Sequence, residues 1–357
     1  MYTSHFGFHL LPFENVPDPI FFFNQGQYNE ILSTLMDSVN AGRGLTVLVG
    51  PIGSGKTTIS QQIAAQFMKT TKLIWLAEPP DSFDELVALI AEEIGIETKD
   101  KTRVFLLRDI RARLLAMQTK SLRCLLIVDE CHRMTKNVLE GIRVLTNLEK
   151  GASKLLQILL IGQEELLDSL KLEEMKALKQ RVSTLRNLEQ MDSDKTRKYI
   201  LHRLQLAGGK PDTFSDHSLN MICLFAGGIP RVVNSFCHHS LRVTYESGQE
   251  TVDPEHVHIA AQELDLEKET FHYLLKLNRS KNKNPSPESH QVSQDHKKTE
   301  DLDISNHDYQ ESTSHKSYNG AVSMQSRRVP FHARILLVLS ILSLFISTWY
   351  YMSKSGL

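Results

Sequence analysis

Two polar clusters in the sequence have residue types and a spacing that suit phosphate chemistry. The first is the glycine-rich segment 50–58, which contains Lys56 and Thr57, and the second is the acidic pair Asp129 and Glu130 about 70 residues later. Glycines let backbone N–H groups face a phosphate, a lysine reaches its terminal oxygens, and a threonine hydroxyl can ligate Mg²⁺. An aspartate can complete the Mg²⁺ shell, and a glutamate can polarise a water toward a γ-phosphate. The two clusters together predict a site that binds ATP with Mg²⁺ and hydrolyses it.

The elements that must position the first cluster are a strand before it and a helix after it. Leu45 to Val49 is short, apolar and rich in β-branched residues, which is typical of a buried parallel strand. A helix from about Lys56 to Met68 follows and adds its positive N-terminal end. A plain glycine-rich turn is the alternative, but it explains neither the lysine nor the threonine. The predicted nucleotide-binding residues are Gly50, Pro51, Ile52, Gly53, Ser54, Gly55, Lys56, Thr57 and Thr58, with Thr57 and Asp129 as predicted metal ligands.

The acidic pair lies at the end of a second apolar strand, 124–128, and makes Glu130 the candidate catalytic acid-base residue. Asp129-Glu130-Cys131-His132 also resembles a helicase motif. We find no second motor domain, so we interpret His132 as a helix-start residue rather than a coupling residue. Another strand, 155–161, ends before Gln163, which is either a sensor beside the γ-phosphate or a simple helix-initiating residue.

Two arginines are candidates for a role near the nucleotide. Arg181 precedes a predicted strand, 182–188, and either points at the nucleotide of a neighbouring subunit or is an ordinary surface arginine. Arg231 follows Gly-Gly-Ile-Pro at a predicted helix start, from which it can fold back on the γ-phosphate.

The remaining pattern is mostly helical and closes with a small helical lid. A helix that begins after Ser82 and one at 102–117 show amphipathic periodicity, and the arginines of the second form either a solvated face or a binding patch. Further predicted elements are a strand at 72–77 and helices at 27–40, 136–150, 164–170, 174–180, 193–207, 215–225, 230–245 and 254–266.

The first residues combine aromatics with prolines. Prolines argue against a regular element and aromatics need burial, so we expect an irregular strap across the nucleotide domain. It either docks as a plain hydrophobic segment or lies near the adenine.

Composition bounds the class of protein. The chain has 357 residues, 41% of them hydrophobic and 23% charged, which suits a folded globular core. A net charge of −1 gives no overall electrostatic footprint for nucleic acid. The four cysteines lack CxxC spacing and are interpreted as reduced apolar residues, and the N-terminus has no signal-peptide pattern.

With these motifs in place, residues 1–266 resemble the ATPase domain of the general secretion pathway protein A family, within the AAA+ superfamily. The ATPases of type IV pilus and exopolysaccharide systems are similar. The resemblance rests on Phe6-Gly7, Pro12-Phe13, Pro17-Asp18-Pro19, Gly50 to Thr57, Val128-Asp129-Glu130, Leu145 to Glu149, Ile161 to Leu166, Gln180-Arg181-Val182 and Gly227 to Asn234. It implies ATP hydrolysis by a homo-oligomer, with Arg181 as candidate finger and Arg231 as second sensor. Phe21 and the Cys131-His132 pair depart from the family pattern.

The last part of the sequence predicts a membrane anchor. Residues 278–328 are polar and cannot bury a core, so we expect a disordered tether. The 18 uncharged residues 335–352 would span about 27 Å as a helix, close to a hydrocarbon core of about 30 Å, and a buried soluble helix is the alternative. Arginines on its N-terminal side place the ATPase in the cytoplasm.

The fold class we predict is α/β: a P-loop NTPase of the AAA+ type with a parallel sheet and a helical lid. The predicted domains are 1–40 (strap and helix), 41–190 (nucleotide-binding core), 191–275 (lid), 276–333 (linker), 335–352 (transmembrane helix) and 353–357 (extracytoplasmic tail). The predicted function is a bacterial inner-membrane ATPase that drives or regulates assembly of an envelope secretion or polysaccharide machine, with ATP and Mg²⁺ as cofactors and no nucleic-acid partner. A DNA-associated ATPase, related to transposition helpers or replication initiators, and a nucleotide-gated scaffold with little hydrolysis are the alternatives.

Overall fold

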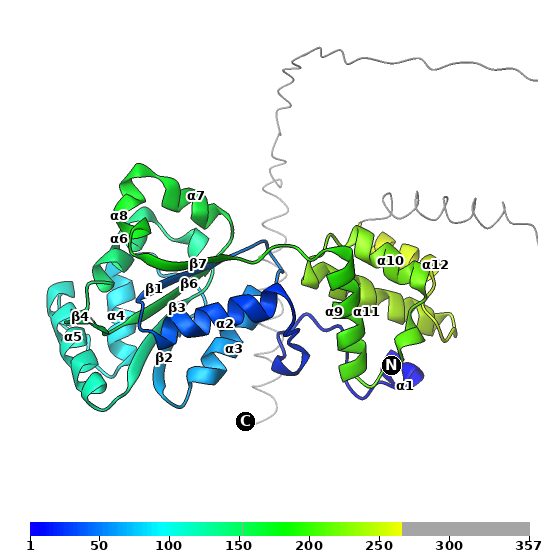
Figure 1. Ribbon diagram of the computed structural model, residues 1–357, viewed down its shortest axis with the longest axis horizontal. Coiled ribbons are helices and arrows are strands. Elements are labelled where there is room, and N and C mark those ends of the chain that lie inside the picture. Colours follow the sequence, from blue (N-terminus) through cyan, green and yellow to red (C-terminus); the bar gives the residue numbers. More distant parts are fainter. Residues whose placement is uncertain (152, 266–357) are drawn as a thin grey trace, which may run out of the picture. The chain divides into compact units, whose positions relative to one another are not determined.

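The computed structural model describes residues 1–151 and 153–265, and it contains an α/β part followed by a helical part (Figure 1). The predicted linker, transmembrane helix and tail lie outside the described residues. Within those residues, no helix combines the length and the apolar character needed to cross a membrane.

A five-stranded parallel sheet forms the centre of the α/β part. Its strands are β1 (Leu45–Val49), β2 (Thr71–Leu76), β3 (Arg123–Val128), β6 (Gln157–Gly162) and β7 (Val182–Asn187), in the order β2-β3-β6-β1-β7. β1 pairs in parallel with β6 on one side and β7 on the other. The carboxyl ends of β1, β3 and β6 therefore meet at one edge of the sheet, where the candidate residues follow them.

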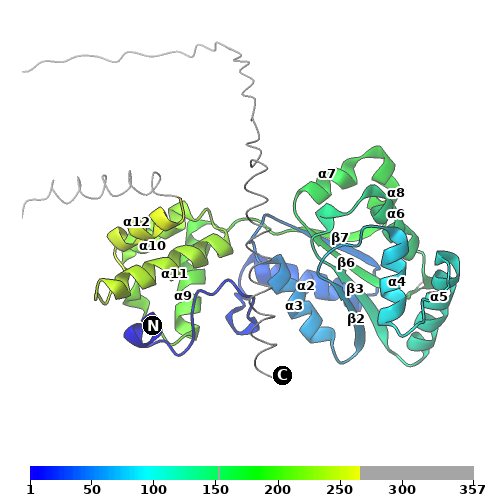
Figure 2. The same cartoon turned by 180° about the vertical axis from the view of Figure 1, so that it is seen from behind.

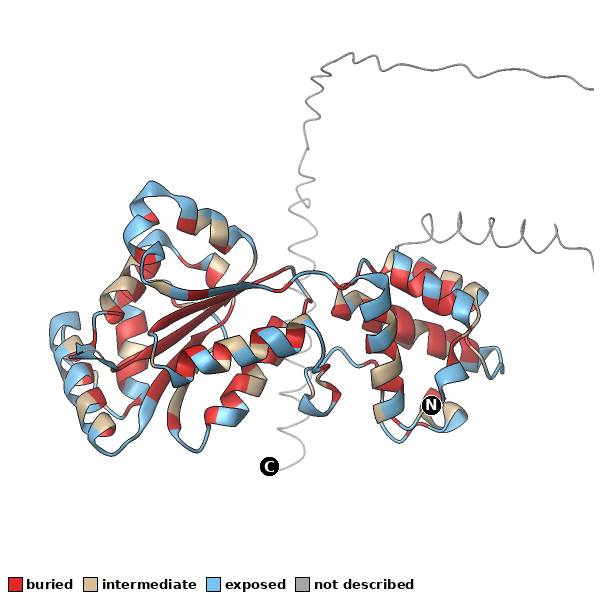
Figure 3. Ribbon diagram, in the orientation of Figure 1, coloured by how far each residue is buried: buried red, intermediate tan, exposed pale blue. Residues whose placement is uncertain are grey.

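Helices cover both faces of this sheet (Figures 1 and 2). They are α2 (Gln27–Asn40), α3 (Lys56–Phe67), α4 (Phe83–Glu93), α5 (Arg103–Thr119), α6 (Lys136–Leu145), α7 (Glu165–Lys171) and α8 (Lys176–Lys179). Alternate strand residues point to opposite faces. Thus Ile127 packs with residues of α2 and α3, whereas Leu126 and Val128 pack with residues of α4, α5 and α6. Burial on both faces explains why β1, β3 and β6 have nearly uninterrupted apolar sequences, and Figure 3 shows these strands in red, whereas the side chains of β7 at the sheet edge are mostly exposed.

The helix predicted to run to residue 150 ends at Leu145, and a small hairpin follows. β4 (Glu149–Lys150) pairs antiparallel with β5 (Ser153–Lys154). The Lys154 ammonium donates to the carbonyl of Thr146, 2.9 Å away, at the C-terminal end of α6. A side chain from the hairpin thus satisfies a helix-end carbonyl, a contact that helical periodicity cannot reveal.

The helical part consists of α9 (Ser193–Leu206), α10 (Asp216–Phe225), α11 (Pro230–Glu246) and α12 (Pro254–Glu263). Asp192 and Ser215 accept hydrogen bonds from backbone N–H groups three residues on, as helix N-caps do. The predicted lid helices are therefore present, with the last one ending at Glu263 rather than at residue 266.

The strap, residues 1–26, departs from the prediction in two ways. It contains a short helix, α1 (Tyr2–Phe6), and a 3₁₀ turn, η1 (Pro19–Phe21). Its first half packs on the lid, not across the nucleotide domain: the Tyr2 hydroxyl lies 3.0 Å from Nδ1 of His238 on α11, and the Phe13 ring meets Phe214 edge to face. The strap aromatics are buried against the apolar surface of the lid. The strap precedes the nucleotide domain in the sequence, and this order did not indicate a contact with the lid.

Candidate nucleotide-binding site

The glycine-rich loop joins the end of β1 to the start of α3. Gly53 and Gly55 have φ values of +76° and +99°, where side chains with a Cβ are strained. A Cβ on Gly53 would also lie 2.7 Å from the Cβ of Arg231. This loop therefore depends on glycine both for its turn and for the close approach of the lid.

Lys56 is the first residue of α3 and is only 7% exposed. Its ammonium donates to the carbonyls of Gly50 and Pro51, each 2.9 Å away, so the side chain lies back along the loop. Burial lowers the pKa of Lys56, while the nearby carboxylates of Glu130 and Asp129 oppose that shift. A buried ammonium beside this loop can pair with an anion that enters the site.

Asp129 connects the loop helix to the acidic strand end. The Thr57 hydroxyl donates to Oδ2 of Asp129 at 2.9 Å, and the Glu130 backbone N–H donates to Oδ1 at 2.9 Å. Mg²⁺ in nucleotide sites takes one or two protein oxygens, with phosphates and waters as the other ligands. The adjacent Thr57 and Asp129 oxygens fit that pattern, and the described residues contain no group of three or more metal-binding side chains.

Glu130 and Gln163 come from neighbouring strand ends and lie together. The Gln163 amide nitrogen is 3.5 Å from Oε2 of Glu130 and 3.0 Å from Nε2 of His132. His132 lies in a short 3₁₀ helix, η2 (Cys131–Arg133), rather than at the start of an α-helix. The structure instead places it between the predicted acid and the predicted sensor.

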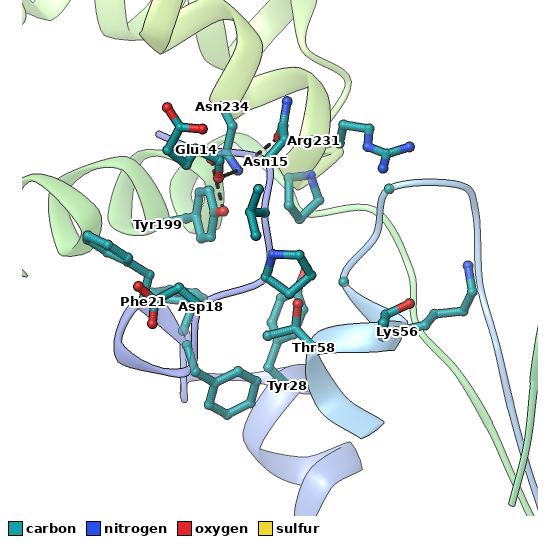
Figure 4. A pocket seen from close by; sticks show the side chains of 18 of the residues that line it. Glu14, Asn15, Asp18, Phe21, Tyr28, Lys56, Thr58, Tyr199, Arg231 and Asn234 are labelled. Atoms are coloured by element: carbon teal, nitrogen blue, oxygen red, sulfur yellow. Dashed lines mark hydrogen bonds between the residues drawn. The ribbon is translucent and has the colours of Figure 1, made fainter. Parts of the chain in front are cut away.

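A cavity of about 300 Å³ opens between the loop, the strap and the lid. The core side of its wall includes Lys56, Thr57, Thr58, Glu130 and Gln163, together with loop residues Ile52, Gly53 and Gly55. Residues of the strap and of the lid complete the wall. In Figure 4, Tyr28 of α2 and Thr58 of α3 lie on one side of the cavity, and Asn234 and Tyr199 of the lid lie opposite them. The volume lies at the lower end of the range for small-molecule sites.

Arg231 reaches this cavity from the start of α11. Its backbone N–H donates to the Gly53 carbonyl at 3.2 Å, and its side chain lines the cavity beside the loop. Figure 4 shows the side chain extending from the lid toward the loop. Arg231 thus lies against the glycine-rich loop, and its role as a second sensor stays a prediction.

Arg181 lies elsewhere. It is exposed, immediately before β7, at the opposite edge of the sheet from the loop, and it does not line the cavity. It lies close enough to Glu149 on the hairpin to contribute to the lowered pKa of that carboxyl, which Lys154 mainly causes. The structure does not bring Arg181 to the site of its own chain.

Several residues of the cavity wall escaped the sequence interpretation. The Tyr28 hydroxyl donates to the Ser54 carbonyl at 3.0 Å, which fixes α2 against the loop. Arg203 on α9 is 7% exposed and donates to the carbonyls of Pro12 (2.5 Å) and Glu14 (3.3 Å), with its guanidinium 4.6 Å from the Phe21 ring centre. Its sequence signal was its position on the apolar face of its helix.

Comparisons with known proteins agree with this geometry. Residues 39–170 match the family model described as an AAA domain. General secretion pathway protein A of Aeromonas hydrophila is 32% identical over 265 residues, which are 74% of this chain and 48% of the relative. The chain thus spans about half the length of that relative.

Solved structures share the fold at low identity. Cdc6p from Pyrobaculum aerophilum matches with a TM-score of 0.54 and 17% identity, over 70% of this chain and 71% of that one. The ORC2 protein of Aeropyrum pernix, in ADPNP–ADP complexes, matches with a TM-score of 0.53 and 15% identity, over 70% and 72%. These likenesses concern the fold alone.

The fold and the family match therefore identify residues 39–170 as an AAA domain, a class of domain that implies nucleotide binding. Beyond that domain, the chain is similar to general secretion pathway protein A over about three quarters of its own length.

Proposed function

We propose that this chain is a Mg²⁺-dependent ATPase. The observation that carries the proposal is the meeting of four side chains at one edge of the sheet. Lys56, Thr57 and Glu130 line one cavity, and Asp129 accepts a hydrogen bond from Thr57. These are the side chains that phosphoryl transfer to water requires.

The roles follow from their positions. The loop amides, the N-terminal end of α3 and Lys56 bind the phosphates. Thr57 and Asp129 would hold Mg²⁺, which would neutralise charge on the phosphate oxygens. Glu130 accepts a proton from the attacking water as the bond between the γ-phosphorus and the leaving ADP oxygen breaks, yielding ADP and inorganic phosphate. Gln163 and Arg231 flank the position of the γ-phosphate from the sheet and from the lid.

The test is release of phosphate from ATP by the full chain in the presence of Mg²⁺, with the loss of that release in the Lys56 and Glu130 variants discussed below. If the chain binds ADP but releases no phosphate from ATP, the proposal of an ATPase is wrong and the alternative of a nucleotide-gated scaffold with little hydrolysis takes its place. Binding of duplex DNA is measured in a parallel assay at moderate salt, because a DNA-associated ATPase is the alternative function. The fold likeness to Cdc6p and ORC2 does not decide between the two.

We further propose that the ATPase works as a homo-oligomer in which Arg181 reaches the nucleotide of a neighbouring subunit. Its exposed position away from its own cavity suits that role. Arg181→Ala should leave ATP affinity within about two-fold of the unaltered chain and lower turnover about 1000-fold, as for other arginine fingers. Arg186→Ala, which changes an exposed arginine on β7, the strand that follows Arg181, is the matched control.

The mixing experiment separates action in trans from action in cis. A Glu130→Gln subunit keeps Arg181, and an Arg181→Ala subunit keeps Glu130, so a mixture should hydrolyse more ATP than the two variants measured separately. A mixture no more active than the sum of its parts would exclude Arg181 as the trans residue.

The proposed setting is the bacterial inner membrane, where the ATPase serves an envelope secretion or polysaccharide machine. This rests on the relationship to general secretion pathway protein A and on the apolar segment 335–352. The full chain should fractionate with membranes and resist extraction by carbonate, whereas a chain cut after Leu275 should not. Recovery of the full chain in the carbonate supernatant would refute the anchor, and digestion of residues 1–330 by protease added outside spheroplasts would refute the cytoplasmic orientation.

A further inference from the structure

Glu130, His132 and Gln163 form a polar cluster in which each member faces the other two. The Gln163 amide nitrogen lies 3.0 Å from Nε2 of His132 and 3.5 Å from Oε2 of Glu130, and Nδ1 of His132 lies 3.4 Å from that same oxygen. Glu130 and Gln163 also line the cavity. The imidazole is therefore the link between two groups at the reaction site.

The directions of these contacts determine which imidazole nitrogen carries the proton. The Gln163 amide nitrogen is a donor, so Nε2 of His132 accepts, and a neutral imidazole then carries its hydrogen on Nδ1. Nδ1 is buried and has no hydrogen-bond partner among the described residues, but it faces Oε2 of Glu130 at 3.4 Å. A movement of about 0.5 Å would convert this contact into a hydrogen bond from Nδ1–H to the carboxylate.

The backbone holds His132 in this place. Glu130 adopts a left-handed conformation, with φ of 53° and ψ of 31°, which turns the chain sharply after β3 into η2. The conformation is uncommon for a residue with a Cβ and costs on the order of 1 kcal/mol or more. A Cβ on Gly162 would lie 3.1 Å from the His132 backbone nitrogen, so a glycine at the end of β6 permits the close approach of the two segments.

We propose that His132 is a positioning residue that joins Glu130 to Gln163, so that the acid and the sensor act as one unit on the attacking water. The inference rests on the proposed ATPase function, since it assigns a role within that site. His132 itself does not line the cavity. It acts by fixing the Glu130 carboxylate, whose side chain is 42% exposed and otherwise free to turn toward solvent.

The inference predicts a loss of turnover without a loss of binding. His132→Ala should lower kcat about 10- to 100-fold, because a misplaced base forfeits much of its effect, and should leave the Kd for ADP within about two-fold. His132→Asn keeps a donor near the position of Nδ1, so it should recover part of the activity. His217→Ala, an exposed histidine on α10, is the matched control and should turn over ATP as the unaltered full chain does.

A double-variant cycle distinguishes positioning from mere packing. If His132 acts through its two neighbours, adding His132→Ala to a chain that already carries Gln163→Ala should lower kcat by less than a further factor of about two. Losses of kcat that multiply, turnover of His132→Ala within two-fold of the unaltered chain, or equal losses in the Ala and Asn variants would each overturn the inference. Loss of ADP binding in all His132 variants would also overturn the inference, because that loss would show that His132 is needed for the folded structure of the site and not for positioning Glu130.

The same assays separate this inference from the proposed function. An unaltered chain that releases phosphate, together with an active His132→Ala variant, refutes the inference alone. An unaltered chain that releases none refutes the ATPase proposal and, with it, the role of His132.

Discussion

Lys56→Ala should bind nucleotide about 100- to 1000-fold more weakly than the unaltered chain. The ammonium is buried in the loop, and truncating one partner of a buried charge pair costs about 3–4 kcal/mol. The change also leaves the Gly50 and Pro51 carbonyls without their donor. Titration calorimetry with ADP and Mg²⁺ measures the effect directly.

Lys69→Ala provides the matched control, since this lysine is exposed just beyond α3 and should have no effect on affinity. Thermal unfolding of Lys56→Ala should remain cooperative, because burial already disfavours the charged ammonium in the folded protein. Unchanged ADP affinity in a folded Lys56→Ala protein would show that this loop does not bind the nucleotide.

Glu130→Gln should lower kcat about 100- to 10,000-fold and leave the affinity for ATP nearly unchanged. The amide keeps the size and polarity of the carboxylate but cannot take a proton from water. Binding should persist because Asp129, which holds Thr57 and the Glu130 backbone N–H, is untouched. Single-turnover release of phosphate, compared with calorimetric binding of ATP, measures the two properties separately.

Glu97→Gln changes an exposed carboxylate remote from the cavity and should turn over ATP at the unaltered rate. A Glu130→Gln protein with turnover within a few-fold of the unaltered chain would show that another group activates the water. In that case Glu130 would remain only a member of the polar cluster with His132 and Gln163.

Local sequence patterns predicted the sheet and most helices well, because the decisive interactions are local or periodic. Leu45 to Val49 is a strand because its alternate residues are buried on both faces, and this appears in the sequence as an uninterrupted apolar run. Ser82 accepts a hydrogen bond from the Glu85 backbone N–H, as the capping pattern predicted. The fold class followed from such signals together with the spacing of the two polar clusters.

Contacts between distant segments were not predictable in this way. The hairpin after α6 depends on Lys154 reaching the end of a helix, and the position of the strap depends on lid residues more than 180 positions later. The contact of His132 with Gln163 was not predictable for the same reason, because Gln163 follows a different strand and only the order of β3 and β6 in the sheet brings the two residues together. The roles predicted for the site residues, the oligomer and the membrane anchor remain predictions.

The attachment of the strap to Arg203 bears on how this segment can change in evolution. Arg203 recognises the strap through main-chain carbonyls at Pro12 and Glu14, which every amino acid provides. Point substitutions at such positions should therefore be tolerated in related sequences as long as the backbone keeps its path. An insertion or deletion between residues 12 and 21 would displace either the carbonyls or the Phe21 ring from the guanidinium. The length of this segment, more than its composition, should be the property that related chains retain.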